Sequence, residues 1–331
     1  MYLLNKSKLW LEFNLLFRAK NWWSTKVPPL LVISYIFLSG QPEKMFYLLI
    51  IFFWIITTGC FGYFTNDWAD AKADQKIGRN NKVAQLSTKI KFLISLGLII
   101  LFFLPWFILP VTWLILCLLT MELLLFIAYS FKPFHLKGRG WLGLIADASY
   151  AYVLPALIIT LAFSLIGNWP NQPLLFLTTL LSWQVITGLR NALSHQIGHR
   201  LEDNLVKVKT FATNLSTSTL QKISQILTII EIITLFGFLV SVANLFPALP
   251  LIYVVFVISR LLIFKPPAPD LANGLLNDFS NEWLGPIILL CLSFNNWQFI
   301  LLLPIHLILF PYPIIGIKKR IGKILKNEST A

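Results

Sequence analysis

Charged residues are scarce in this sequence of 331 residues. Only 12% of the residues are Asp, Glu, Lys or Arg, whereas 57% are hydrophobic, and the mean hydropathy is +0.73. Because a soluble domain carries roughly 25% charged residues, a globular protein with a large core is excluded. The composition therefore predicts a polytopic membrane protein, and its long apolar runs predict an all-α bundle of transmembrane helices.

The sequence is also poor in cysteine and in the motifs of common soluble enzymes. Cys60, Cys117 and Cys291 all fall within apolar runs and show no metal-ligand spacing, so we interpret them as packing residues. There is no P-loop, no G-x-G-x-x-G, no C-x-x-C and no recognisable Ser-His-Asp arrangement. These absences argue against a nucleotide-binding fold, a paired-cysteine zinc site and a serine hydrolase.

Long apolar segments account for most of the chain. The last of them is too long for one straight helix of ~20 residues, and Asn295-Asn296 near its middle suits a turn between two short spans. The first begins with Pro28-Pro29, so its helix is expected to start earlier. The sequence thus predicts nine or ten spans, at about 27–40, 45–65, 90–110, 111–130, 141–167, 173–194, 220–243, 246–264 and 283–316.

Basic residues are concentrated in alternate connections between these spans. Lys and Arg are present in loops 66–89, 131–140 and 195–219 and absent from the connections near 110, 168–172 and 244–246. By the positive-inside rule the first three loops are cytoplasmic, in a multi-pass protein of the cell membrane. The net charge of +13 follows this pattern, so it indicates topology and attraction to anionic head groups or a diphosphate rather than nucleic acid.

The same patterns divide the chain into three parts. The N-terminal residues interleave apolar and basic side chains, are too polar for a cleaved signal peptide, and suit an amphipathic segment on the cytoplasmic surface. The halves of the remaining chain also echo each other, each leading from a pair of spans to a polar cytoplasmic loop. We expect the amphipathic segment over 1–26, a transmembrane domain over 27–316 and a basic cytoplasmic tail over 317–331.

Three of the seven aspartates lie in one stretch, Asn66–Asp74. Asp67, Asp70 and Asp74 are spaced i, i+3, i+7, so a helix would place all three carboxylates on one face. Like charges stacked in this way repel each other, and a divalent cation would relieve the repulsion. Hard oxygen ligands presented one per turn suit Mg²⁺ that carries a phosphate. The alternative, an ordinary helix end with its acids paired to nearby lysines, explains the cluster less well.

This stretch resembles the first signature of the UbiA superfamily of intramembrane prenyltransferases, N-D-x-x-D-x-x-x-D. Asn66, Asp67, Asp70 and Asp74 match every fixed position, and the stretch follows the second apolar span, as in that family. The resemblance implies that Asn66 orients a carboxylate or binds a phosphate oxygen. It also implies that the three aspartates hold Mg²⁺ against a prenyl diphosphate.

The resemblance extends over nearly the full length. Arg18–Lys26 is similar to the family's arginine, tryptophan and lysine residues before span one, and Tyr129-Ser130 with the basic residues after it is similar to the loop after span four. One departure follows the first motif, where many members have Arg-Pro and this chain has Arg79-Asn80-Asn81.

The second polar stretch departs from the family at one position. The family's second motif is D-x-x-x-D followed by a lysine; Asp203 and Lys209 match, but His199 stands in place of the earlier aspartate. Because imidazole is a poor Mg²⁺ ligand, only Asp203 is expected to hold a metal here. His195, His199 and Asp203 are also spaced i, i+4, i+8, which leaves a transition-metal site open. We favour a face that contacts substrate, with His199 donating a hydrogen bond to the diphosphate.

Further polar residues are candidates for substrate binding. The cytoplasmic cations would neutralise a departing diphosphate, although each of them also fits a purely topological role. A charge near membrane depth is costly and usually faces a cavity, which singles out Arg190 with its neighbour Asn191, and also Asp147. Tyrosine faces could stabilise a cation. The remaining candidates for substrate contact are Lys132, Lys137, Arg139, Tyr129, Tyr150 and Tyr152.

The resemblance implies a membrane-embedded prenyltransferase. It would move a prenyl group from a polyprenyl diphosphate to an acceptor, with an aromatic or quinone precursor favoured, by Mg²⁺-assisted ionisation of the diphosphate. Its partners would be the prenyl diphosphate, the acceptor and the lipid bilayer, and not nucleic acid. Two alternatives remain: the same fold with a phosphosugar or lipid acceptor, and a non-catalytic membrane protein that binds a prenyl lipid.

Overall fold

A computed structural model describes residues 8–263 and 278–311, and this part of the chain contains helices but no strands. The all-α prediction is therefore confirmed. The α-helices are α1 (Lys8–Phe17), α2 (Ala19–Phe37), α3 (Phe46–Lys76), α4 (Thr88–Phe103), α5 (Trp113–Ser130), α6 (Trp141–Ala148), α7 (Leu154–Ile166), α8 (Pro173–Gly198), α9 (Arg200–Leu205), α10 (Thr217–Ser241), α11 (Leu249–Ile263), α13 (Leu284–Asn295) and α14 (Leu302–Leu309).

The helices follow the predicted apolar segments closely. Five helical stretches in the described residues are long and apolar enough to cross a membrane: α3, α4 with its 3₁₀ extension, α5, α6 through α7, and α10. α13 ends at Asn295, so the expected turn at Asn295-Asn296 is present. The number of spans, nine or ten, stays a prediction, and the predicted basic tail, 317–331, lies outside the described residues.

Two boundaries differ from the sequence-based ones. α2 begins at Ala19 and contains Pro28 and Pro29 in its interior, so the predicted boundary at residue 26 falls inside a helix. α3 continues to Lys76, so Asn66–Asp74 forms its last turns rather than the beginning of a loop. The polar residues follow the apolar run without Gly or Pro between them, and nothing ends the helix before Gly78.

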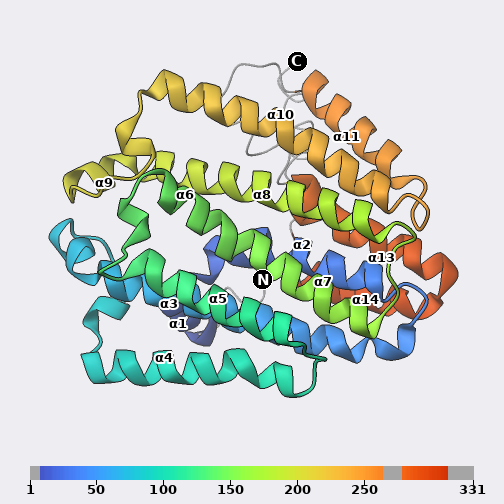
Figure 1. The fold of residues 1–331 in the computed structure, drawn as a ribbon, viewed down its shortest axis with the longest axis horizontal. Coiled ribbons are helices and arrows are strands. Elements are labelled where there is room, and N and C mark those ends of the chain that lie inside the picture. The colour runs from blue at the N-terminus through green and yellow to red at the C-terminus, as the bar shows by residue number, and fades with distance from the viewer. Residues whose placement is uncertain (1–7, 264–277, 312–331) are drawn as a thin grey trace, which may run out of the picture.

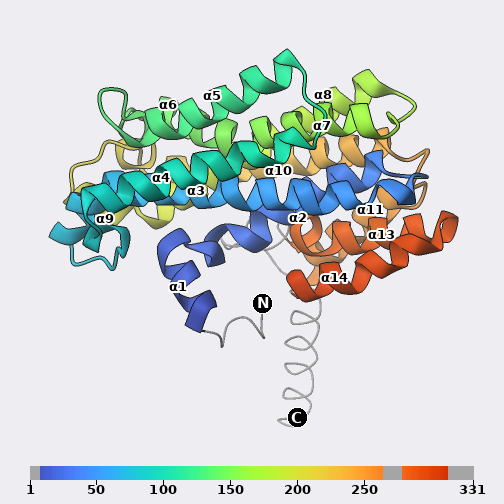
Figure 2. The same ribbon diagram turned by 90° about the horizontal axis from the view of Figure 1, so that it is seen from below.

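The long helices form a bundle with α4 and α10 on its outside (Figure 1). α10 packs on α8, α6 packs on α8, and α4 packs on α3. α1 lies at the edge of the bundle, against α2 and α3 (Figure 2). Small residues permit the closest approaches: a Cβ on Gly188 of α8 would lie 2.9 Å from Ala148 of α6.

A π-helical turn, η6 (Ser149–Val153), joins α6 to α7. Pro155 follows this turn at the start of α7 and has no N–H to continue the regular ladder, while the Leu154 N–H bonds to the carbonyl of Ser149, five residues back. The wider turn places Tyr150 and Tyr152 on the inner side of the bundle, where both are buried.

Candidate active site

A cavity of about 550 Å³ lies within the bundle, lined by residues of α2, α3, α5, α6, η6, α7 and α8. On α3 it extends from Asn66 back to Trp54, which is roughly 18 Å along a helix axis. Polar residues of α3 and α8 line one end, and Leu30, Trp54 and Pro155 line the other. The cavity is thus long enough to hold an extended apolar chain with a polar head at the end of α3 and α8.

Asp67 and Asp74 are not among the residues that line this cavity. Asp67 is 1% exposed and forms an ion pair with Arg18, in which it accepts a hydrogen bond of 2.8 Å from Arg18 Nε. Asp74 accepts from Asn81 Nδ2 at 2.8 Å and lies 3.8 Å from an Arg18 nitrogen and 3.7 Å from an Arg79 nitrogen. Because the stretch is helical, the three motif aspartates lie on one face of α3, but two of them pair with Arg18.

Asn66 and Asp70 lie on the side of α3 nearer the cavity. Asn66 lines the cavity and donates to Asp70 Oδ2 at 3.2 Å. Asp70 also forms an ion pair with Lys137, from the loop between α5 and α6. One of the cations predicted to bind the diphosphate, Lys137, therefore contacts the first motif directly.

The second polar stretch provides two imidazoles to the cavity. His195 and His199 both line it, with ring centroids 4.6 Å apart. His199 Nδ1 lies 2.9 Å from Glu202 Oε2, and this hydrogen bond lowers the pKa of Glu202. Glu202 also lies 3.3 Å from Arg79, so one chain of contacts links His199 to Asp74 of the first motif.

Asp203 lies beside the second stretch but is not a cavity-lining residue. Burial raises the pKa of its carboxyl, with nearby Lys137 and His199 opposing that effect. Its side chain has a hydrogen bond with Thr210. The structure therefore brings Asp203 close to the Asp70–Lys137 pair without placing it in the cavity.

Arg190 and Asn191 have different environments although they are neighbours. Arg190 is 0% exposed and pairs with Glu231 of α10, which also accepts from the Thr187 hydroxyl at 2.9 Å. Asn191 lines the cavity and donates to the Tyr152 hydroxyl at 2.9 Å. The expectation of a cavity-facing arginine is not met, because Arg190 turns to a carboxylate on the neighbouring helix.

The remaining predicted cations lie at the surface. Lys132, Arg139 and Lys209 are exposed, and none of them lines the cavity. Arg139 donates to the Pro133 carbonyl at 2.9 Å and so stabilises its own loop. The Lys209 carbonyl accepts from the Gly140 N–H at 3.1 Å, which ties that loop to the one before α10.

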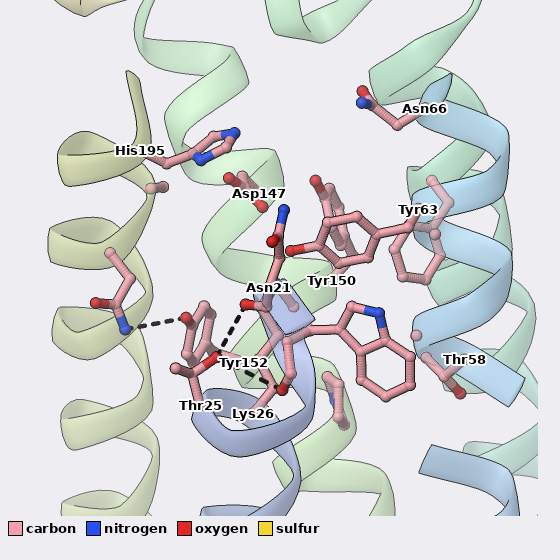
Figure 3. A pocket seen from close by; sticks show the side chains of 18 of the residues that line it. Asn21, Thr25, Lys26, Thr58, Tyr63, Asn66, Asp147, Tyr150, Tyr152 and His195 are labelled. Carbon is pink, nitrogen blue, oxygen red and sulfur yellow. Dashed lines mark hydrogen bonds between the residues drawn. The ribbon is translucent and has the colours of Figure 1, made fainter. Parts of the chain in front are cut away.

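Several cavity residues were not selected from the sequence. Asn21, Thr25 and Lys26 of α2 and Tyr63 of α3 all line the cavity (Figure 3), and of these only Lys26 stood out in the sequence, through the family resemblance. Asp147 of α6, singled out as a charge inside an apolar segment, also lines the cavity, as expected (Figure 3).

Tyrosine rings line the middle of the cavity. Tyr63, Tyr129, Tyr150 and Tyr152 contribute to its wall, and Tyr129 and Tyr150 contact each other edge to face at 5.2 Å between ring centroids. The ammonium of Lys26 lies 5.7 Å from the ring centroid of Tyr63 and 5.2 Å from that of Tyr152. This arrangement holds a cation over aromatic faces.

The first motif fits a metal ion that is shared with a substrate. In the described residues no group of three or more His, Cys, Asp or Glu side chains is arranged to hold a metal by itself. Asp67 Oδ1, however, is buried and has no hydrogen-bond partner in this part of the chain. Mg²⁺ is commonly bound by one or two carboxylates together with substrate phosphates, and an acceptor oxygen of this kind suits it.

Comparisons with known proteins agree with this geometry at the level of the fold. By sequence, the chain matches no protein-family profile and no curated protein. Among solved structures it is similar to a UbiA homolog from Archaeoglobus fulgidus bound to DMAPP and Mg²⁺, with a TM-score of 0.57 and 14% identity over 87% of this chain and 98% of that one. The same homolog bound to GPP and Mg²⁺ gives a TM-score of 0.57 and 14% identity, over 87% and 99% of the two chains.

A second solved structure, of digeranylgeranylglyceryl phosphate synthase, is similar with a TM-score of 0.52 and 15% identity. The match covers 85% of this chain and 95% of that one. Both neighbours are matched over almost their whole length, so the similarity is not limited to a few helices. The helical bundle that carries the Asn66–Asp74 motif therefore has the UbiA fold.

Proposed function

We propose that this protein is a membrane-embedded prenyltransferase that moves a prenyl group from a prenyl diphosphate to an acceptor, with an aromatic or quinone precursor favoured. The main support is one observation: the N-D-x-x-D-x-x-x-D motif ends a helix at the polar end of a long, aromatic-lined cavity in a UbiA fold. The structural neighbours support the same reaction class, since they are UbiA homologues bound to DMAPP or GPP with Mg²⁺ and a prenylglyceryl phosphate synthase.

The diphosphate would lie between the ends of α3 and α8. Asn66 and His199 line the cavity there, and Lys137 is held beside it by Asp70. These groups supply hydrogen bonds and positive charge to phosphate oxygens. Arg190 is not part of this proposal, because its guanidinium is engaged by Glu231.

Asp67, Asp70 and Asp74 would hold Mg²⁺, with Asp203 as a further candidate. When bound, the metal would act as a Lewis acid that neutralises the diphosphate and favours breaking the allylic C–O bond. Arg18 and Lys137 pair with Asp67 and Asp70, so these cations also hold the two carboxylates in place.

The rest of the cavity would hold the prenyl chain. Its apolar end, with Leu30, Trp54 and Pro155, matches an isoprenoid tail, and the tyrosine faces in the middle would stabilise the allylic cation as the diphosphate leaves. Exclusion of water from this part would protect the cation until the acceptor attacks.

A direct test measures the transfer of a radiolabelled geranyl group from geranyl diphosphate in membranes, with and without Mg²⁺. We expect Asp67→Asn, Asp70→Asn and Asp74→Asn each to lower transfer by at least about 10²-fold, the size typical of losing one electrostatic group at a reacting centre. Glu43→Gln is the matched control, because Glu43 is an exposed carboxylate of the short turn between α2 and α3.

Undiminished transfer in all three aspartate variants would sink the proposal. Binding of geranyl diphosphate by the wild type without turnover, across a panel of aromatic, phosphosugar and lipid acceptors, would instead support a non-catalytic prenyl-lipid-binding protein.

A further inference from the structure

Asp147 occupies a position that the diphosphate site does not use. It lies in the last turn of α6, and its carboxylate points into the cavity between His195 and Tyr150 (Figure 3). Among the described residues that line the cavity, Asp147 is the only one with a carboxylate. The aspartates of the first motif are engaged elsewhere, with Arg18, Asn81 and Lys137.

The surroundings of Asp147 fix its place while leaving it accessible. Its side chain has a hydrogen bond with Tyr150, and its charge also acts on Tyr63, Tyr129 and Tyr152. Gly188 lets α8 approach the backbone of Ala148, the next residue, so the end of α6 is held firmly. A carboxylate on a fixed helix end is well suited to receive a proton at a defined point.

Lys26 faces the same part of the cavity from the opposite wall. Among the described residues, no carboxylate forms an ion pair with its ammonium, although Asp147 is near enough to act on it electrostatically. The two charges thus flank the cavity without closing on each other. A half-buried ammonium and a half-buried carboxylate that remain apart suit a ligand group that both accepts and donates hydrogen bonds, as a hydroxyl does.

From this arrangement we propose that Asp147 is a catalytic residue outside the aspartate motif, which accepts the proton of a hydroxyl-bearing acceptor, a phenol or an alcohol, bound between Asp147 and Lys26. The proposal rests on the prenyl transfer proposed above.

The step balances with the groups present. The nucleophilic atom of the acceptor, either the hydroxyl oxygen or a ring carbon conjugated with it, forms a bond to C1 of the prenyl group. The bond from C1 to the diphosphate oxygen breaks, and the diphosphate leaves with that electron pair. The hydroxyl proton passes to Asp147, while the Lys26 ammonium donates to the hydroxyl oxygen and stabilises its developing negative charge. No oxidant or reductant is needed.

The test separates breaking of the diphosphate bond from transfer to the acceptor. Purified protein in nanodiscs is given radiolabelled geranyl diphosphate and Mg²⁺, and diphosphate release is measured together with transfer to 4-hydroxybenzoate, 1-naphthol and 1-octanol. For Asp147→Asn we expect transfer to fall by at least about 10²-fold, as for loss of a general base. Diphosphate release should fall by less than about threefold, since the groups of the first motif are untouched.

Two variants serve as controls for folding and geometry. Asp147→Glu keeps a carboxylate and should recover part of the transfer, whereas Tyr150→Phe removes only the hydrogen bond to Asp147 and should lower transfer less than Asp147→Asn does. An equal loss of release and transfer in Asp147→Asn would overturn the proposal, since it indicates a role in binding the diphosphate or in folding. Unchanged transfer would overturn it as well.

The wild type distinguishes this proposal from the one it rests on. Wild-type protein that releases diphosphate but transfers the geranyl group to none of the three hydroxyl probes would overturn the hydroxyl-acceptor class alone. Wild-type protein that neither releases diphosphate nor transfers the group would count against prenyl transfer itself.

Discussion

The end of α3 and the corresponding segment of α8 and α9 lead into similar turns but carry different chemistry, and α3 is unbroken where the second half is interrupted at His199. Each position of the first end corresponds to one 129 residues later, so Asn66 matches His195 and Asp74 matches Asp203. After Asp74 the chain turns through Gly78, with φ of 68°, and after Asp203 it turns through Lys207, with φ of 59°. In both places an N–H five residues after the aspartate donates to the aspartate carbonyl at 2.9 Å.

The correspondence continues into the next helices. A side-chain oxygen accepts from a backbone N–H three residues later in each half: Asn81 from Ala84 at 3.0 Å and Thr210 from Thr213 at 3.3 Å. A short 3₁₀ helix follows, and a serine then caps α4 or α10. The predicted internal echo is therefore a structural repeat in the described residues.

The difference between the halves lies in the side chains at the polar mouth of the cavity. Asn66 and Asp70 of the first half correspond to His195 and His199 of the second. The first half therefore offers oxygen ligands for a hard cation, whereas the second offers imidazoles, which suit hydrogen bonding to phosphate. Within the nine positions of the first motif, only Asp74 and its counterpart Asp203 are identical, and they mark the same position before the turn.

The largest expected effect on geranyl transfer comes from replacing Asp70 and its counterpart His199 one at a time. Asp70→Asn should lower geranyl transfer by at least about 10²-fold, because it weakens metal binding and releases Lys137. His199→Asn at the matching position should cost about tenfold or less, because it removes one hydrogen bond to the diphosphate. Transfer rates in the same membranes, normalised to protein amount, give the comparison. Equal losses would mean that the two halves contribute alike.

Much of the helical framework follows from the sequence. The apolar segments, the early start of the helix with Pro28-Pro29 and the turn at Asn295-Asn296 are local properties of the chain. The motif was visible because aspartate is rare in this chain and three of its seven aspartates, Asp67, Asp70 and Asp74, lie close together. These features depend on composition and spacing, which a sequence displays directly.

The partners of the charged residues could not be predicted in the same way. Arg18 reaches Asp67, 49 positions away, and Arg190 reaches Glu231 on another helix. Such pairs depend on how each helix is rotated about its axis, which a highly apolar helix reveals poorly because most of its faces are hydrophobic. The cavity position of Lys26 could not be predicted for the same reason.

A smaller effect is expected from making the second half more like the first. His199→Asp should lower the Mg²⁺ concentration that gives half-maximal transfer by about threefold to tenfold, since a carboxylate is a better ligand for this ion than imidazole. The measurement is a Mg²⁺ titration of transfer at saturating geranyl diphosphate. His199→Asn is the matched control, because it removes the imidazole without adding a carboxylate. An unchanged half-saturation would show that residue 199 does not contact the metal.

The smallest effect concerns the two turns. Both Gly78 and Lys207 adopt positive φ, a conformation that costs a side-chain-bearing residue about 1 kcal/mol and glycine very little. Gly78→Ala should therefore lower the free energy of unfolding by about 1 kcal/mol, and since a Cβ there meets nothing within 4 Å, conformational strain alone is responsible.

Lys207→Gly should raise the free energy of unfolding by a smaller amount, about 0.5 kcal/mol, because relief of strain is partly offset by the greater freedom of glycine in the unfolded chain. Thermal and denaturant unfolding of the two variants in one detergent give the signs. Changes of opposite sign in the free energy of unfolding would support the view that positive φ strains the turn at Lys207 and not the one at Gly78. A destabilised Lys207→Gly variant would mean that the Lys207 side chain contributes contacts that outweigh its backbone strain, and the turns would then be alike in shape but not in energetics.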